Sequence, residues 1–416
     1  MRIAMISEHA SPLAVLGGAD AGGQNVHVAA LSTHLAQRGH EVRVYTRRDD
    51  AGLDPWVPLA PGVDVVNVDA GPPAAIPKDE LLPYMPALAS GVARDWADWM
   101  PDVAHSHFWM SGVAALAAAS RAVLPPPVLH TFHALGVVKR RHQGAQDTSP
   151  PEREWLEPGV GRAVDGIIAT CSDEAFELRQ LGVAAGRITV IPCGVDLGHF
   201  APEGPSEERR RRYRVLSVGR LVPRKGVGTV IEAIATLARD GIDVELVVVG
   251  GGATSPAGND PELDRLAAVV RARDASAHVE LRGQVPQADL PEIYRSADLV
   301  VCAPWYEPFG IVPLEAMACG VPVLASSVGG LIDTVVDDVT GRHVPPRDLP
   351  ALVDGIRRLL ESPDDRARMG AQGRHRVEGR YSWDRVAAET ERAYRAAVTG
   401  HRGADLPLGR AYGVKP

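Results

Sequence analysis

Residues 307–315 read Glu-Pro-Phe-Gly-Ile-Val-Pro-Leu-Glu, and this stretch decides the fold class of the chain. The strand-like run Leu299–Ala303 precedes it, and an apolar, helix-like run over residues 314–320 follows it. A strand, a glycine-containing loop and a helix start form the unit with which α/β proteins present backbone N–H groups to an anionic ligand. The segment therefore predicts an α/β fold with an anion site at the end of a strand.

The two carboxylates of this stretch, Glu307 and Glu315, narrow the choice of ligand. They cannot hold phosphates themselves, because like charges repel, so we expect them to face hydroxyl groups, which donate hydrogen bonds to them. A ligand that carries both phosphate and many hydroxyls is a sugar nucleotide. An isolated pair of this kind also fits two solvated carboxylates, so the interpretation depends on the motifs that accompany it.

Length and composition indicate a two-domain globular protein. The 416 residues suffice for two domains of about 200 residues each, and 45% of them are hydrophobic. The net charge of −8 argues against non-specific nucleic-acid binding. No apolar run reaches about 18 residues, and the short N-terminal run reads as a strand rather than a signal peptide. We expect a cytoplasmic protein; peripheral membrane contact and the oligomeric state stay open.

The four cysteines form no C-x-x-C pair and are expected to be buried thiols: Cys171, Cys193, Cys302 and Cys319.

Strand-like and helix-like runs alternate in both halves, which predicts two doubly wound parallel sheets. Residues 203–212 are polar and without pattern, so they are expected to link the halves. Two such halves place the ligand site in the cleft between them. The predicted strands are Ile3–Ser7, Val42–Thr46, Val63–Val68, Val103–His107, Val128–Phe132, Gly166–Cys171 and Ile188–Ile191, then Val215–Val218, Val244–Val249, Val279–Leu281, Leu299–Cys302 and Val321–Ala325.

Two further glycine-containing loops are informative, and each follows the first predicted strand of one half. Residues 17–25 read Gly-Gly-Ala-Asp-Ala-Gly-Gly-Gln-Asn, which is not a dinucleotide fingerprint but allows backbone to approach a phosphate. Residues 219–226 read Gly-Arg-Leu-Val-Pro-Arg-Lys-Gly, and Arg220 and Lys225 are expected to contact a diphosphate. Arg224 is expected to be a solvated neighbour.

Together these motifs resemble the retaining glycosyltransferases of family 4, with their E-x7-E and G-R-x4-K-G signatures, over nearly the whole chain. The glycine loop is most similar to that of the mycothiol glycosyltransferase and sucrose-phosphate synthase branch. The resemblance implies a GT-B fold: two Rossmann-like domains facing a central cleft. Residues 1–200 would bind the acceptor, residues 201–382 would bind the nucleotide sugar, and a helix at 383–400 would cross back to the first domain.

The resemblance also implies roles for the donor site. Glu307 would contact the hydroxyls of the transferred sugar and Glu315 those of the ribose. Arg220 and Lys225 would straddle the diphosphate and stabilise the leaving nucleotide. The catalytic residues would be His133, Arg220, Lys225 and Glu307, and no metal or cofactor is expected. The other donor contacts would be Gly22, Gly23, Val285, Phe309, Gly310, Ile311 and Val312.

The acceptor contacts are less clearly indicated than the donor contacts. The candidates are Asn25, Lys78, His107, Lys139 and Arg153, and the cations among them also fit ordinary surface positions. Family members that use inositol phosphate carry a threonine after the active-site histidine and a tyrosine in the H-S-H segment. Ala134 and Phe108 stand there in this chain, so two hydroxyls that could bind phosphate are missing.

The predicted activity is retaining transfer of a hexosyl or N-acetylhexosaminyl group from a nucleotide-diphosphate sugar to a hydroxyl acceptor. A UDP-sugar is favoured as donor, and GDP-mannose is the alternative. Two other classes stay open: a non-transferring enzyme of the same fold, such as a sugar-nucleotide 2-epimerase, and a sugar-nucleotide binding protein without turnover. The expected partners are the donor and a small-molecule or glycan acceptor, not nucleic acid.

Overall fold

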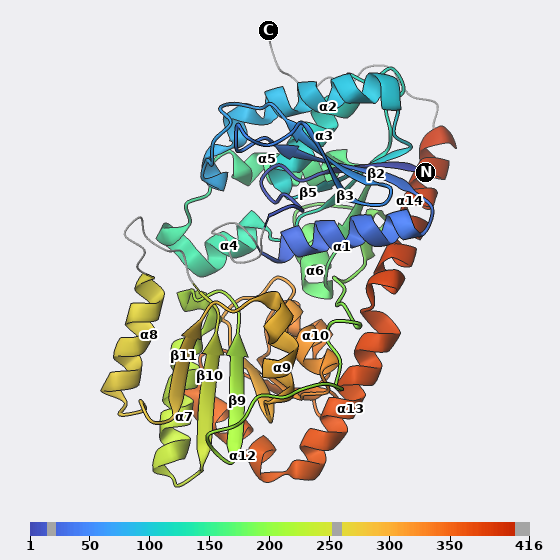
Figure 1. Ribbon diagram of the computed structural model, residues 1–416. Coiled ribbons are helices and arrows are strands. Elements are labelled where there is room, and N and C mark those ends of the chain that lie inside the picture. Colours follow the sequence, from blue (N-terminus) through green and yellow to red (C-terminus); the bar gives the residue numbers. More distant parts are fainter. Residues whose placement is uncertain (15–21, 252–259, 404–416) are drawn as a thin grey trace.

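The chain forms two α/β halves, each built on its own twisted sheet (Figure 1). The computed structural model describes residues 1–14, 22–251 and 260–403. Positions 17–21 of the predicted glycine loop therefore lie outside the described residues, whereas Gly22 and Gly23 lie within them. In Figure 1 the two sheets lie one above the other, with α1 (Gly23–Gln37), α4 (Gly136–Gln143) and α6 (Ser172–Gln180) at their boundary.

The first sheet has eight strands in the order β3-β4-β2-β1-β5-β6-β7-β8. All neighbouring pairs are parallel except β3 with β4, which are antiparallel. The seven predicted strands are present to within two residues at each end. Strand β3 was not predicted, because a hairpin partner at the sheet edge with Pro58 inside it has little strand signal. The bounds are β1 Arg2–Ile6, β2 Glu41–Arg47, β3 Trp56–Ala60, β4 Val63–Val68, β5 Val103–His107, β6 Val128–Thr131, β7 Gly166–Ala169 and β8 Ile188–Val190.

The second sheet has six parallel strands in the order β11-β10-β9-β12-β13-β14. Strands β10 and β13 are wholly buried and β12 is buried except at Cys302, as expected of a sheet covered by helices on both faces. Strand β14, the other strand not predicted, is a short edge strand with two polar residues. The bounds are β9 Tyr213–Val218, β10 Val244–Val249, β11 Val279–Gly283, β12 Leu299–Cys302, β13 Val323–Ser326 and β14 Gly341–Val344.

Helices cover both sheets. Besides α1, α4 and α6 the first half contains α2 Met85–Trp99, α3 Trp109–Ala119 and α5 Arg153–Ala163. The second half contains α7 Val227–Arg239, α8 Pro261–Ala272, α9 Leu290–Arg295, α10 Ile311–Ala318, α11 Leu331–Thr334, α12 Leu349–Glu361 and α13 Pro363–Arg380. In the part of the chain that the structure covers, none of the helices combines the length and apolar character that crossing a bilayer requires.

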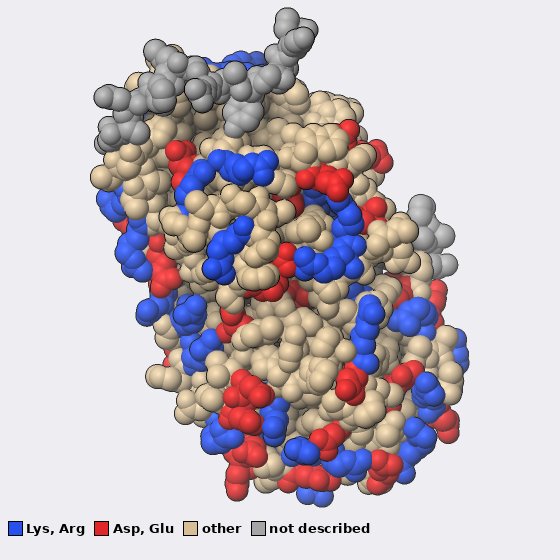
Figure 2. Space-filling view, turned by 180° about the vertical axis from the view of Figure 1, so that it is seen from behind, with Lys and Arg blue, Asp and Glu red and all other residues tan. Residues whose placement is uncertain are grey.

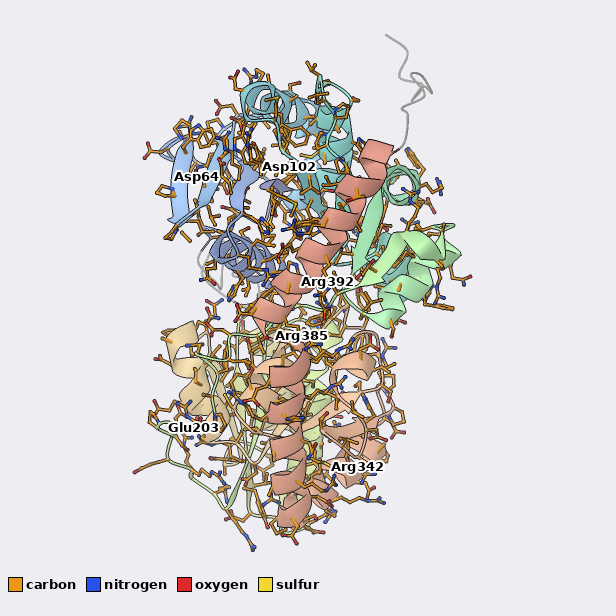
Figure 3. The ribbon with its side chains drawn as sticks, turned by 90° about the vertical axis from the view of Figure 1, so that its right-hand side faces the viewer. Asp64, Asp102, Glu203, Arg342, Arg385 and Arg392 are labelled. Carbon is orange, nitrogen blue, oxygen red and sulfur yellow. The ribbon has the colours of Figure 1, made fainter. Side chains whose placement is uncertain are left out.

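The last helix, α14 (Trp383–Gly403), joins the two halves. It packs against α1 and β5 of the first half, and the Tyr394 hydroxyl hydrogen-bonds to Nδ1 of His105 over 2.7 Å. In Figure 3 the helix that carries Arg385 and Arg392 starts near the boundary between the halves and runs along the first half. The predicted crossing helix at 383–400 is therefore present and continues to Gly403.

The strand order places the ligand site. In each sheet the connections run in opposite directions on the two sides of the first strand, between β1 and β5 and between β9 and β12. Loops that leave such a switch point diverge and open a crevice at the carboxyl ends of the strands. The loop after β9 contains Arg220 and Lys225, and the loop after β12 contains Glu307 and Gly310. The predicted donor motifs thus lie on the two loops that border one crevice.

Candidate active site

A cavity of about 370 Å³ lies between the two halves and is lined by residues of both. A smaller cavity adjoins it on the side of the second sheet and shares Arg220, Lys225 and Glu307 with it. The larger cavity brings together these predicted site residues: Gly22, Gly23, Lys78, His133, Lys139, Arg220, Lys225, Glu307, Phe309, Gly310, Ile311 and Val312.

Two helix starts meet at this cavity. Gly310 caps α10 with a φ of 89°, a left-handed conformation that favours glycine, and a side chain there would meet Leu331. The first turn of a helix leaves its N–H groups without an intrahelical partner, so those of Ile311 and Val312 are available to a ligand. A Cβ atom on Gly23 would lie 3.1 Å from Cδ1 of Ile311. The starts of α1 and α10 therefore face each other closely across the cleft.

The cations of the second half surround one carboxylate. Lys225 Nζ donates a hydrogen bond to Oε2 of Glu307, and the carboxylate is buried. Burial would raise the pKa of Glu307, but Lys225, Arg224 and Arg220 together outweigh it and hold the pKa below its ordinary value. Glu307 is therefore ionised at neutral pH, and the cations beside it can interact with a further anion.

Arg224 belongs to this group, contrary to the expectation that it would be a solvated neighbour. Its guanidinium donates to the carbonyl of Tyr306 over 2.9 Å and lies 3.7 Å from Glu307. It also lines the larger cavity. The sequence gives no signal for this placement, because the short 3-10 turn Pro223–Lys225 decides which way the side chain points.

His133 faces these cations from the first half. Its φ of 61° and the φ of 77° at Phe108 are left-handed values, which are rare for residues other than glycine. Such conformations are strained, and they occur here at the ends of the adjacent strands β5 and β6. Burial, with neighbouring histidines adding to its effect, lowers the pKa of His133 well below its ordinary value. The imidazole is therefore neutral, and its Nε2 lies 3.0 Å from Nδ1 of His107.

Five predicted contacts do not line either cavity: Asn25, His107, Arg153, Val285 and Glu315. Asn25 is buried, and its side chain bonds to the N–H of Gly22 and the carbonyl of Ser11, so it fixes the start of α1. Arg153 is 2% exposed and is paired with Glu157, which removes it from the surface that the acceptor could reach.

Glu315 lies one turn into α10 and is partly exposed, although it lines neither cavity. The hydroxyl of Tyr294 donates to its Oε2 over 2.6 Å. Burial raises the pKa of Glu315 to about 7, although the bond from Tyr294 acts in the opposite direction. Among the described residues, no group of three or more His, Cys, Asp and Glu side chains is arranged to hold a metal ion.

Comparisons with known proteins agree with this geometry. Residues 21–199 match the family model described as Glycosyltransferase Family 4, and residues 203–376 match that of Glycosyl transferases group 1. The chain is 37% identical to a D-inositol 3-phosphate glycosyltransferase of Kineococcus radiotolerans, over 97% of this chain and 98% of that one. It is 38% identical to the protein of the same name from Kribbella flavida, over 95% and 96%.

Solved structures give the same result. A sucrose-phosphate synthase from Thermosynechococcus elongatus is 32% identical, with a TM-score of 0.86 over 96% of this chain and 99% of that one. HepE from Anabaena, solved in complex with UDP-glucose, is 18% identical with a TM-score of 0.73, which is a likeness of fold. With its two facing α/β halves, the chain belongs to the family 4 glycosyltransferases, retaining enzymes of the GT-B fold.

Proposed function

We propose that this enzyme transfers a hexosyl or N-acetylhexosaminyl group from a UDP-sugar to a hydroxyl group of its acceptor, with retention of configuration. The observation that carries the proposal is the grouping of Arg220, Lys225 and the start of α10 around Glu307, opposite His133. The fold neighbour solved with UDP-glucose supports the choice of base. In this proposal residues 201–382 bind the donor, and residues 1–200 supply the acceptor side.

The diphosphate of the donor would lie between the two cations and the free N–H groups of Ile311 and Val312. As the bond between the anomeric carbon and the diphosphate oxygen breaks, negative charge grows on that oxygen. Arg220 and Lys225 stabilise this charge from fixed positions, so little reorganisation is needed during the reaction. The cations thereby make the nucleotide diphosphate a better leaving group.

The acceptor hydroxyl would attack from the face that the diphosphate leaves. A new bond forms between acceptor oxygen and anomeric carbon on that face, which preserves the configuration. The departing β-phosphate oxygen takes the proton of the hydroxyl, so no protein base is required. Glu307 accepts hydrogen bonds from hydroxyls of the transferred sugar, and the neutral His133 orients the sugar or the acceptor from the other side.

Ligand-induced stabilisation tests the proposal directly. The melting temperature would be measured with UDP-, GDP-, ADP- and dTDP-sugars, because a ligand that binds only the native state raises it. We expect the UDP-sugars to give the largest shift and Lys225→Ala to abolish most of it. A larger shift with GDP-mannose would favour the alternative donor. No shift with any of them would overturn the sugar-nucleotide site.

A second arm separates transfer from binding alone. Release of UDP would be followed in the presence of a mixed panel of hydroxyl acceptors, with Lys225→Ala as the matched variant. Turnover that depends on Lys225 supports a transferase. Tight donor binding without turnover on any acceptor would instead favour a binding protein of the same fold.

A further inference from the structure

The acceptor side of the cleft holds its cations in ion pairs. Lys139 lines the cavity, and its Nζ lies 2.9 Å from Oδ1 of Asp147 and 3.9 Å from Asp79, while it also donates to Ser149. Burial would raise the pKa of Asp147, but the bonds from Lys139 and Ser149 outweigh it and lower the pKa to about 2. The charge of Lys139 is therefore largely balanced before any acceptor binds.

Arg153 is even more completely engaged. Its Nε donates to Glu157 over 2.8 Å, and its Nη2 donates to the carbonyl of Ala134 over 2.6 Å. The ring of Phe108 covers one face of the guanidinium at 5.1 Å. With both edges bonded and one face covered, this buried arginine cannot form the bidentate contact by which arginine recognises phosphate.

The other cations of α4 repeat the pattern. Arg140 bonds to Glu154 over 2.6 Å, and Arg141 bonds to both oxygens of Glu177 over 2.6 and 3.0 Å. Lys78, which also lines this wall, is not free of interactions either. Charges of both signs are likewise interspersed on the face shown in Figure 2, rather than gathered by sign.

Once the donor is bound, its side of the cleft has no excess positive charge. Arg220, Arg224 and Lys225 face the single carboxylate of Glu307. The diphosphate of a bound sugar nucleotide would add two negative charges, which together with Glu307 balance the three cations. An acceptor phosphate would enter a cleft in which Lys139 and Arg153 are already paired and the donor-side cations are balanced by the diphosphate, and burying an unmatched charge is costly.

We propose that the acceptor is an uncharged polyhydroxyl molecule, such as a sugar or cyclitol without a phosphate group. The inference rests on the proposed function and deepens it by naming the acceptor class. It sets this chain apart from the relatives whose names specify inositol 3-phosphate. Neutral hydrogen-bonding side chains are present for such a molecule: Gln24, His133, Gln143 and Thr170 line the cavity.

Phosphate binding to the donor-loaded enzyme tests the inference without knowledge of the acceptor. Inorganic phosphate would be titrated by calorimetry into protein saturated with UDP, whose own binding is measured first. We expect no binding to the wild type and gain of binding in Asp147→Asn, because that change frees Lys139. The matched control is Asp95→Asn, which breaks the ion pair of Asp95 with Arg43 (2.9 Å) away from the cleft. This variant should not gain phosphate binding.

Each outcome decides the matter. Phosphate binding to the wild type that Lys139→Gln removes would overturn the inference, as would an Asp147→Asn variant that behaves like the wild type. Failure of UDP itself to bind would count against the proposed function instead. In turnover assays, the neutral member of each pair (inositol or inositol phosphate, glucose or glucose 6-phosphate) should have the higher kcat/KM by about tenfold or more, and the reverse preference would overturn the inference.

Discussion

Donor affinity should depend on pH through Glu315. Burial raises the pKa of this carboxyl to about 7, and Tyr294 bonds to it over 2.6 Å. If the ionised carboxylate accepts bonds from the ribose hydroxyls, only the ionised fraction binds donor well. With a pKa near 7 that fraction is about one tenth at pH 6 and about nine tenths at pH 8, so the Kd should be about tenfold higher at pH 6.

Isothermal calorimetry with an intact UDP-sugar across pH 6 to 8 measures this dependence. Free UDP is unsuitable, because its terminal phosphate is expected to titrate near pH ~6. His133 should not contribute, because its pKa lies well below its ordinary value. Glu315→Gln should bind weakly with a flat profile. Tyr294→Phe should move the midpoint to higher pH, because the bond from Tyr294 lowers the pKa of Glu315.

Two results would refute this reasoning. A wild-type Kd that is constant between pH 6 and 8 would show that the ionisation of Glu315 does not matter for the donor. A Glu315→Gln variant that keeps the wild-type dependence would assign the titration to another group. Titrations in two buffers of different ionisation enthalpy count the protons released on binding, which checks the same conclusion independently.

Three further predictions concern a site residue, a buried carboxyl group and a contact between the halves. Glu307→Gln should lower kcat by about tenfold to hundredfold in initial-rate assays while leaving the Kd of UDP no weaker, because it removes contacts to the sugar and not to the diphosphate; an unchanged kcat would contradict the assigned role. The pKa of Glu174 is raised by burial from 4.5 to about 7, so its favourable contribution to stability is present below pH 4.5 and is lost as pH rises through 7. Glu174→Gln should therefore raise the melting temperature at pH 8 but not at pH 4.5, and an equal shift at both would refute the sign. Asp333→Ala should speed hydrogen exchange at the amide of Ser172, because Asp333 on α11 accepts bonds from the N–H and hydroxyl of Ser172 across the two halves; unchanged exchange would show that this contact does not hold the halves together.

Much of the fold could be predicted because the core strands are continuous apolar runs between glycine-containing loops. The run at 299–302 is strand β12 with the predicted bounds, and α10 begins at Ile311, directly after Gly310. Strand β3 is partly exposed and contains Pro58, and the short strand β14 has two polar residues, so their sequences do not differ clearly from loops. The edge strands β8 and β11 were predicted together with the central strands, so the misses are confined to the two edge strands with the weakest strand pattern.

The candidate site also contains residues that the sequence predicts and residues that it does not. The motif residues lie on loops at the switch point, where fold topology alone brings Lys225 and Glu307 together. The position of Arg224 depends on the direction of a short 3-10 turn, and the contact of Tyr294 depends on its packing against α10. Neither feature leaves a pattern in the sequence. Asn25 was predicted as an acceptor contact from the family resemblance and Arg153 as a cation that could bind an acidic acceptor, but the start of α1 and Glu157 already engage them.

The predicted linker, residues 203–212, was likewise predicted only in part. It lacks periodicity and forms no helix or strand, as predicted. Its charged residues are nevertheless held on the second half: Arg209 bonds to Asp298 over 2.7 Å, and Glu207 bonds to Arg282 over 2.7 Å. A charge run without pattern therefore predicts the absence of regular structure, but not the absence of fixed contacts.

In the proposed function, Arg220, Lys225 and the start of α10 hold the diphosphate of a nucleotide sugar. The most direct measurement compares the Kd of UDP with that of uridine, in the wild type, in Lys225→Gln and in a control, Arg239→Gln, at the far end of α7. We expect Lys225→Gln to weaken UDP binding by about tenfold to hundredfold and to leave uridine binding unchanged, and the control to alter neither. Equal loss for UDP and uridine in Lys225→Gln, or no loss for either, would contradict it.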